Sequence, residues 1–304
     1  MTDELRKLTL GIGTVRFDEP MANHTTLRVG GPADVFVEPN NLDELRRALA
    51  LAREHDQSVT IIGGGSNLLI TEAGVRGLVV RLGHGFETLR FDEGTVSAGA
   101  ATSLTRLVRE CARNGLAGLE FAIGIPGTVG GAVFGNAGAG GGEVGASAER
   151  VRCVTLAGDL RDFTREEAGF RYRGSALGDG VVVEVTFPQT RGDAETLSQH
   201  IRESLARRKA TQPIDKMNAG CIFKNTPLGP AGKLIEQMGG KGMRVGAAVV
   251  SALHANFILN EGGASAAEVL ELIAQVRARF REHYGCEVET EIRQLGEERE
   301  AGHE

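Results

Sequence analysis

The sequence predicts an α+β protein, and three observations lead to that expectation. Short β-branched runs typical of strands alternate with segments whose apolar residues recur at helical spacing. Hydrophobic residues make up 41% of the 304 residues, enough for a sizeable core in one large or two to three modest domains. The 43 glycines gather in a few short segments, which indicates places where main chain comes close to something else.

The first two-thirds of the chain shows the clearest alternation of strands and helices. Strands are expected at 34–39, 59–62, 78–82 and 181–187. Helices are expected at 42–54 and 103–114, and Gly115 is placed to end the second of them. A nucleotide-sized site is expected in this part of the chain.

From about residue 200 the chain reads as a separate α+β unit. Its clearest helix is expected at 266–283, where Ser265 and Glu268 form a capping box and Gly285 ends the helix. The last strand is expected at 287–293. The division predicted is therefore into domains 1–95, 96–199 and 200–304, followed from 296 by a polar tail that we expect to be mobile.

Composition excludes several classes of function. The net charge of −6, with no block of like charge, argues against binding to nucleic acid or to an anionic membrane. The start MTDELRKLTL lacks an apolar core, and no stretch approaches ~18 apolar residues, so neither a signal peptide nor a membrane span is expected. The four cysteines show no CxxC pair and no zinc spacing, so we expect reduced thiols of a cytoplasmic protein and no metal.

The stretch IIGGGSNLLI carries the first candidate site. Without Cβ atoms, Gly63, Gly64 and Gly65 can point several N–H groups at one anion. The side chains of Ser66 and Asn67 can add hydrogen bonds to phosphate. A diphosphate cradle and a tight turn between strands both remain open from this stretch alone.

Neither of the common phosphate motifs is present. A dinucleotide-binding fingerprint needs G-x-G-x-x-G opening a helix, whereas strand-like LLI follows the glycines here. Gly11 and Gly13 lack both the third glycine and the preceding strand, and no G-x-x-x-x-G-K-[ST] occurs. The phosphate site expected here is therefore of another kind.

The second segment is GIPGTVGGAVFGNAGAGGGEVG, residues 124–145. So many glycines make a helix or a regular strand improbable across it. A long loop of this kind needs something to order it, and a flat aromatic ligand against bare main chain would do so. Two such segments together point to a dinucleotide, and their composition fits FAD at least as well as NAD.

The third segment is NAGCIFKN, residues 218–225. The thiol of Cys221 can give a proton to a carbanion-like intermediate, but from this segment alone a small buried hydrophobe, as most free cysteines are, is the favoured interpretation. Lys224 and Asn225 alternate with apolar residues and can therefore line a wet cleft.

Through these three segments the chain resembles the UDP-N-acetylenolpyruvoylglucosamine reductases, the MurB family of flavoenzymes. The motifs that carry the resemblance appear in family order over nearly the whole chain: NHTTLRVGGPAD (23–34), IIGGGSNLLI (61–70), GLEFAIGIPGTVGGAVFGNAGAGGGEVG (118–145), FRYRGS (170–175), NAGCIFKN (218–225) and ETEIRQLG (289–296).

The resemblance implies the FAD-binding fold of the vanillyl-alcohol oxidase type, with two α+β FAD-binding subdomains and a substrate domain from about 200. It implies that residues 63–67 hold the diphosphate of non-covalent FAD and that 124–136 pass along the flavin. The second set of cofactor residues comprises Gly124, Ile125, Pro126, Gly127, Thr128, Gly131 and Asn136.

The implied reaction belongs to peptidoglycan precursor synthesis. NADPH reduces the flavin and leaves; UDP-N-acetylglucosamine enolpyruvate then takes hydride at C3 and a proton at C2, giving UDP-N-acetylmuramate. Negative charge builds on C2 and the adjoining carboxylate during this step. We expect a monomer with these two small-molecule partners.

Three positions match the family's catalytic residues. Arg173 would hold the carboxylate or developing enolate by paired hydrogen bonds. Glu291 can stabilise the same charge only if it is protonated or shares a proton. Cys221 stands where many members have serine and would protonate C2. Before the match, a surface or structural arginine and an exposed strand glutamate are the favoured explanations of Arg173 and Glu291.

Substrate contacts are expected at Lys224, Asn225 and His254, where a structural histidine is the alternative for the last. The basic residues 207–209 suit a diphosphate or a solvated helix face. The chain lacks the tyrosine-bearing insertion of one branch of the family, which places it in the shorter branch. Thr226 and Thr290 occur where proline is common, and we expect only local changes there.

Two rival functions use the same scaffold. An oxidase with covalent flavin needs His, Cys or Tyr near the ring, and the glycine segments 63–67 and 124–142 contain none. A non-catalytic nucleotide-sugar binder would have lost part of the catalytic set, which is complete here.

Overall fold

The computed structural model describes residues 11–296, so the predictions for the start of the chain and for 297–304 lie outside it. The chain folds as two compact units, each discontinuous in sequence. The first unit comprises the chain up to Phe17, Val35–Gly64 and Gly77–Arg207. The second comprises Asp18–Asp34, Gly65–Arg76 and the chain from Arg208 onward. The predicted division into three domains stays a prediction.

A small sheet with the strand order β1-β2-β5-β3 begins the fold. Its strands are β1 (Thr14–Pro20), β2 (Pro32–Glu38), β5 (Val75–Arg81) and β3 (Val59–Ile62). Helix α2 (Leu42–Glu54) buries Leu45, Ala48, Leu49 and Ala52 in the core beside this sheet. Asn41 caps α2 by accepting a hydrogen bond from the amide of Glu44 at 2.9 Å. Helix 42–54 and strand 59–62 are thus confirmed as predicted.

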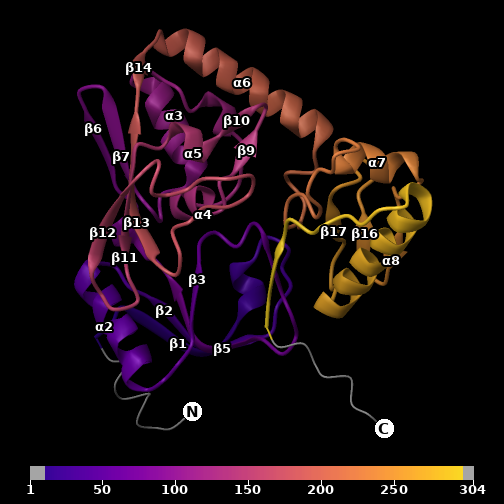
Figure 1. The fold of residues 1–304 in the computed structure, drawn as a ribbon, viewed down its shortest axis with the longest axis horizontal. Coiled ribbons are helices and arrows are strands. Elements are labelled where there is room, and N and C mark those ends of the chain that lie inside the picture. The colour runs from indigo at the N-terminus through magenta and orange to yellow at the C-terminus, as the bar shows by residue number, and fades with distance from the viewer. Residues whose placement is uncertain (1–10, 297–304) are drawn as a thin grey trace. The chain divides into compact units, whose positions relative to one another are not determined.

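A second sheet of the first unit runs in the order β12-β11-β13-β7-β6 (Figure 1). Its antiparallel strands are β6 (Leu89–Asp92), β7 (Thr95–Gly99), β11 (Arg150–Val154), β12 (Leu160–Thr164) and β13 (Val181–Pro188). Helix α4 (Val129–Phe134) packs against β7 and β13, and both α3 (Leu104–Arg113) and α5 (Val144–Ser147) contact α4. This packing fixes the second glycine segment on one face of the sheet.

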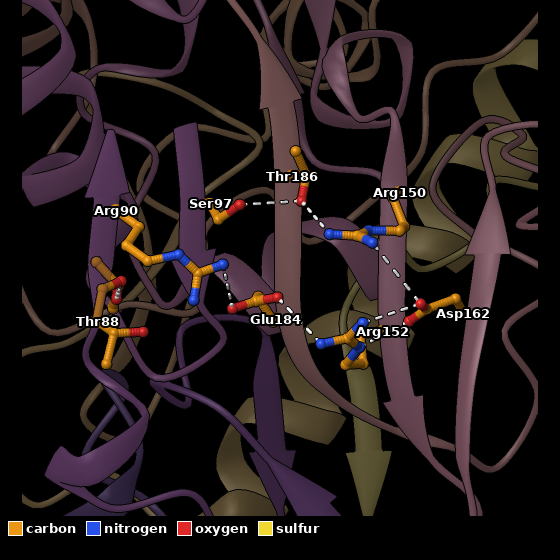
Figure 2. A network of polar contacts seen from close by, with 9 residues as sticks. Thr88, Arg90, Ser97, Arg150, Arg152, Asp162, Glu184 and Thr186 are labelled. Atoms are coloured by element: carbon orange, nitrogen blue, oxygen red, sulfur yellow. Dashed lines mark hydrogen bonds and ion pairs between the residues drawn. The ribbon is translucent and has the colours of Figure 1, made fainter. Parts of the chain in front are cut away.

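The opposite face of the same sheet is polar (Figure 2). Arg152 donates to both carboxylate oxygens of Asp162, at 2.8 and 3.0 Å, and lies 3.6 Å from Glu184. Arg90 extends the row by approaching Glu184 at 3.4 Å. Side chains alternate between the two faces of a strand, so an apolar face toward the helices leaves this face for charged residues.

The second unit builds its core around helix α8 (Ala266–Tyr284). Ser265 and Glu268 form the predicted capping box, and Gly285 ends the helix in a left-handed conformation with φ 70°. Helix α7 (Ala231–Gln237) and the sheet β15-β16-β17 complete this core. The strands of that sheet are β15 (Arg244–Val245), β16 (Ala248–Val250) and β17 (Ile258–Asn260).

The strand predicted at 287–293 is wrong in position. The structure has β18 at Arg293–Leu295, paired in parallel with β4 (Leu68–Ile70), while only an isolated bridge joins Thr290 to Phe223. The pairing partner lies more than two hundred residues away, so the local pattern could not reveal it.

The remaining elements are one long helix and several short strands and 3₁₀ helices. The long helix is α6 (Ala194–Thr211). The short elements are the strands β8 (Leu116–Ala117), β9 (Gly138–Ala139), β10 (Gly142–Glu143) and β14 (Thr190–Arg191), and the 3₁₀ helices η1 (Met21–His24), η2 (His84–Phe86) and η3 (Glu120–Ala122).

The prediction that no helix or strand forms within 124–145 is also wrong. Helix α4 contains two glycines, and Thr128 begins it by accepting a hydrogen bond from the amide of Gly131 at 3.4 Å. Val129 and Val133 are fully buried, so tertiary packing outweighs the poor helix propensity of glycine. No helix in the described part of the chain is long and apolar enough to cross a membrane.

Candidate functional site

Two glycine segments predicted to bind a cofactor lie side by side in the first unit. A Cβ placed on Gly63 would come within 2.5 Å of Thr128 Oγ1, and one on Gly64 within 2.9 Å of the Cα of Gly127. Such contacts are too short for a real side chain. Residues 63–64 can therefore approach 127–128 this closely because Gly63 and Gly64 have no side chains.

The second segment is held by main-chain hydrogen bonds to the residues before α3. The amide of Val129 donates to the carbonyl of Thr102 at 2.9 Å, and that of Gly130 to Ala100 at 2.9 Å. Gly124 and Gly127 have positive φ values of 77° and 103°. Pro126 and Gly131 are exposed, whereas Ile125 is buried. The segment thus presents a fixed strip of main chain at the surface of the first unit.

Asn136, predicted to bind the cofactor, has its side chain inside the protein. It is 1% exposed, and its Nδ2 donates to Glu143 Oε2 and to the carbonyl of Arg171, both at 2.9 Å. Its Oδ1 accepts from the amide of Gly145 at 2.9 Å. The side-chain amide of Asn136 therefore makes its hydrogen bonds within the protein. A contact between the cofactor and the main chain of Asn136 stays a prediction.

Arg173 lies in the same unit, in a turn closed by reciprocal main-chain hydrogen bonds of 3.0 Å between Arg171 and Gly174. Its φ is 55°, in the left-handed region. The guanidinium carbon lies 4.7 Å from the ring centroid of Tyr172. A Cβ on Gly138 would approach Arg173 Nη1 at 3.3 Å, so the guanidinium reaches the glycine-rich segment.

The other half of the first glycine cluster belongs to the second unit. Gly65 has φ 65°, and a Cβ there would overlap the carbonyl oxygen of His24. The carbonyl of Gly65 accepts from the amide of Thr26 at 3.1 Å. A Cβ on Gly220 would lie 3.7 Å from the carbonyl oxygen of Ser66. Ser66 is therefore a neighbour of the NAGCIFKN segment.

Cys221 and Glu291 lie on adjacent stretches of main chain in the second unit. The amide of Glu291 donates to the carbonyl of Ile222 at 2.7 Å, and Asn67 Nδ2 donates to the carbonyl of Glu291 at 3.2 Å. Both candidate catalytic side chains are half-buried. The structure therefore gathers Asn67, Cys221 and Glu291 from three distant parts of the sequence.

Arg208 is a neighbour of Cys221 that no single motif could assign. Burial lowers the pKa of Arg208, while attraction to the Cys221 thiolate raises it. The sequence showed only a basic run, 207–209, at the end of α6. The path of the chain between helix α6 and Cys221 brings Arg208 near the thiol, and no periodicity in the sequence predicts that path.

The predicted substrate residues all have partners inside the second unit. Lys224 Nζ donates to Glu289 at 2.8 Å in an exposed ion pair, a type that contributes little to stability. Asn225 Oδ1 accepts from the amide of Ala231 at 3.1 Å and so caps the start of α7. Their roles toward a substrate stay predictions.

His254 has the features of a structural histidine. Its Nδ1 accepts from the amide of Asn256 at 3.2 Å, which places the proton of the neutral ring on Nε2. Burial lowers the pKa of His254 and favours that neutral form. Its ring meets that of Phe257 edge-on at 5.0 Å. Within residues 11–296 no group of three His, Cys, Asp or Glu side chains is arranged to hold a metal.

Two family models match the chain. One describes an FAD-binding domain and matches residues 33–164; the other describes the C-terminal domain of UDP-N-acetylenolpyruvoylglucosamine reductase and matches 212–295. The first covers the glycine segments and the second covers Cys221 and Glu291. The predicted α+β fold of the FAD-binding type is confirmed.

Similar proteins cover nearly the whole chain. A UDP-N-acetylenolpyruvoylglucosamine reductase from Halalkalibacterium halodurans is 41% identical over 98% of this chain and 99% of its own length. A second, from Symbiobacterium thermophilum, is 43% identical over 97% of each. The crystal structure of the enzyme from Thermus caldophilus superposes with a TM-score of 0.80 at 39% identity, covering 93% of this chain and 98% of that one.

Proposed function

This chain belongs to the UDP-N-acetylenolpyruvoylglucosamine reductase family, and we propose that it catalyses that family's reaction with the residues described above. The proposed substrate is UDP-N-acetylglucosamine enolpyruvate, the electron donor is NADPH and the product is UDP-N-acetylmuramate for peptidoglycan synthesis. The observation that carries the proposal is the close approach of segments 63–64 and 127–131, two glycine-containing stretches of main chain that lie side by side.

FAD is the cofactor of this family, and the residues present fit it. Exposed main chain at Gly64 and Gly131, free of Cβ atoms, suits a diphosphate and a flat ring better than a packed core. When bound, FAD takes two electrons from NADPH and delivers a hydride to C3 of the enolpyruvyl group. The first unit would hold the group through the predicted residues of 63–64 and 124–131. Gly65, Ser66 and Asn67 continue the first of these segments and stay predicted cofactor residues.

Arg173 would bind the carboxylate of the enolpyruvyl group. Negative charge spreads onto this carboxylate as C3 gains hydrogen, and a planar guanidinium can pair with both of its oxygens. The attraction grows as the charge develops, so Arg173 would stabilise the transition state more than the bound substrate.

Cys221 would protonate C2, which completes the addition of two hydrogens across the double bond. A thiol is an adequate donor because its reference pKa is ~8.5. Arg208 would then stabilise the thiolate left behind, in keeping with the attraction between these two groups. Glu291, close along the main chain, would stabilise the charge on the enolate if it carries or shares a proton.

The remaining proposals concern the substrate-binding residues, the substrate domain and the location of the protein in the cell. Lys224, Asn225 and His254 would contact the substrate, and 200–304 would form the substrate domain. Four cysteines without disulfides in the described residues suit a reducing compartment, so we propose a cytoplasmic location. The expected monomer stays a separate proposal.

The test records the visible absorbance of the flavin under anaerobic conditions. Purified protein should be yellow, should bleach on addition of NADPH and should regain its colour when UDP-N-acetylglucosamine enolpyruvate is added. Bleaching with no return of colour would exclude the proposed substrate. Protein that stays colourless after incubation with FAD would exclude the flavoenzyme altogether.

A further inference from the structure

The turn that carries Arg173 holds this residue in an unfavourable conformation. A non-glycine residue in the left-handed region costs ~1–2 kcal/mol, and such a conformation persists only where the surroundings hold it in place. With φ at 55°, Arg173 needs partners that fix the turn from Arg171 to Gly174. The structure supplies them from two directions.

The first support is the buried amide of Asn136. It donates to the carbonyl of Arg171, the residue that opens the turn, and on its other side it bonds Glu143 and the amide of Gly145. One side chain therefore ties the turn to the glycine-rich loop. Asn136 itself has φ 44°, so two left-handed residues are joined by one hydrogen-bond network.

Further hydrogen bonds secure the same turn from its other end. Ser175 Oγ donates to the carbonyl of Phe134 at 2.9 Å, and Arg171 Nη1 donates to the carbonyl of Ser175 at 2.8 Å. Phe134 is the last residue of α4, so the helix that carries the second glycine segment also anchors the turn. The main chain of Arg173 is thus fixed relative to that segment.

The second support acts on the guanidinium itself. Its carbon lies 4.7 Å from the centroid of the Tyr172 ring, which is within the range of a cation–π contact. On another side, the absence of a Cβ on Gly138 leaves room for Nη1 at 3.3 Å. Tyr172 is 46% exposed, so its ring contributes little to the core and mainly limits where the guanidinium can go.

We propose that Asn136 and Tyr172 are positioning residues for the reductase, Asn136 by fixing the turn and Tyr172 by orienting the Arg173 guanidinium. This inference rests on the proposed role of Arg173. It assigns to Asn136 a different task from the cofactor contact that the sequence suggested. It also gives a chemical reason for an exposed tyrosine in the FRYRGS segment.

The main test is a double-mutant cycle on the anaerobic reoxidation of the reduced flavin by UDP-N-acetylglucosamine enolpyruvate. Tyr172→Leu should slow reoxidation about two- to fivefold, the range of an exposed cation–π contact, and Tyr172→Phe should restore the rate. In an Arg173→Ala background, Tyr172→Leu should add no further loss, because its partner is gone. Reduction by NADPH, flavin content and melting temperature should stay unchanged throughout.

A matched control uses another exposed aromatic ring of the first unit. Phe91 is 39% exposed on β6. Phe91→Leu should therefore change neither half-reaction. An equal loss in Phe91→Leu and Tyr172→Leu would overturn the proposed role of the ring.

A second variant tests the turn. Asn136→Asp keeps the size of the side chain but replaces the donor facing Arg171 and Glu143 by an oxygen. A displacement of the guanidinium of about 1 Å should slow reoxidation about 100-fold, with full flavin content. Loss of flavin with normal reoxidation after saturation with FAD would instead make Asn136 a cofactor residue and overturn its positioning role.

The outcomes separate this inference from the proposed function. If Arg173→Ala itself leaves reoxidation unchanged, the proposed role of Arg173 fails. Two other results are informative when Arg173→Ala does slow reoxidation: Tyr172→Leu alone leaves the rate unchanged, or Tyr172→Leu lowers the rate by its full factor even in the Arg173→Ala background. Either of these results contradicts only the positioning of Arg173 by Tyr172. Should Asn136→Asp fail to fold, the cycle on the exposed Tyr172 still tests the orientation of the Arg173 guanidinium.

Discussion

The two compact units differ in what they offer to ligands. The first unit presents mostly main chain, at segments 63–64 and 124–131, with one guanidinium beside it. The second presents side chains that can give or accept protons, Cys221 and Glu291, on two paired stretches of main chain. From this comparison we propose a division of labour between the units: main chain of the first unit would bind the cofactor, and side chains of the second unit would transfer protons. Substitutions in the two units should therefore fail in different ways.

The largest expected effect is at the proton donor. Cys221→Ala should slow reoxidation of the flavin by substrate about 10²- to 10⁴-fold, the usual contribution of a general acid. Reduction by NADPH and flavin content should remain nearly normal. Stopped-flow measurement of both half-reactions checks this, with Cys221→Ser as the variant that keeps a donor. Equal losses in both half-reactions would contradict the division of labour.

The next effect concerns the main chain of the first unit. Gly131 lies within α4, and a Cβ there would meet only Thr128 Oγ1 at an ordinary 3.5 Å. Gly131→Ala should therefore raise protein stability by up to ~1 kcal/mol. The same methyl group should weaken FAD about 10- to 100-fold if the flavin lies against this main chain.

The absorbance of bound flavin per polypeptide, measured beside the melting temperature of the apoprotein, checks this prediction. Gly140→Ala is the matched control, since a Cβ there meets nothing within 4 Å. It should keep its flavin despite some strain from φ 58°. Unchanged flavin affinity in Gly131→Ala would remove this segment from the cofactor site.

A smaller effect is expected in the first sheet of the first unit, at the carboxylate of Glu38 on β2. Glu38 accepts from Arg81 Nε at 3.0 Å and pairs with Arg16 at 3.0 Å. Burial alone would raise the pKa of Glu38, but Arg81 and then Arg16 lower it below its usual range. Glu38→Gln should lower the free energy of unfolding by ~1–3 kcal/mol at neutral pH.

The pH dependence has a definite sign. Because the folded pKa is lowered, the contribution of Glu38 is complete above the usual carboxylate value of 4.5 and is lost as pH falls through the lower folded value. Urea unfolding at neutral and acid pH should therefore show a smaller acid loss for Glu38→Gln than for the unchanged protein. Parallel pH profiles would contradict this.

The smallest expected effect is a loss of stability in the second unit that leaves flavin content unchanged. Ser265→Ala removes the capping box of α8 and should cost ~1 kcal/mol of stability. Flavin content should not change. Ser198→Ala, inside α6 and without a capping role, should be neutral or slightly stabilising. Calorimetry on the two variants checks the difference, and equal melting temperatures would argue against the cap.

Local features of the sequence predicted the regular elements well. Helix α8 has its capping box and its terminal glycine where the sequence placed them, because both depend on neighbours along the chain. Strand β18 was misplaced, because its position is decided by pairing with the distant β4. Helix α4 was missed, because burial of Val129 and Val133 overcomes its glycines.

The candidate site was predictable to the level of segments but not of side chains. The three glycine-containing segments stood out because no regular element needs their composition. The capping role of Asn225 and the internal network of Asn136 depend on partners several to thirty-five residues away, which no spacing rule reveals. Arg208 was indistinguishable from its basic neighbours until the chain after α6 brought it near Cys221.

The most direct measurement is a crystal structure of the protein with FAD bound. We expect diphosphate oxygens within hydrogen-bond distance of main-chain nitrogens in 63–67, and the isoalloxazine ring along 124–131. FAD bound elsewhere, with these two segments packed only against protein, would contradict it.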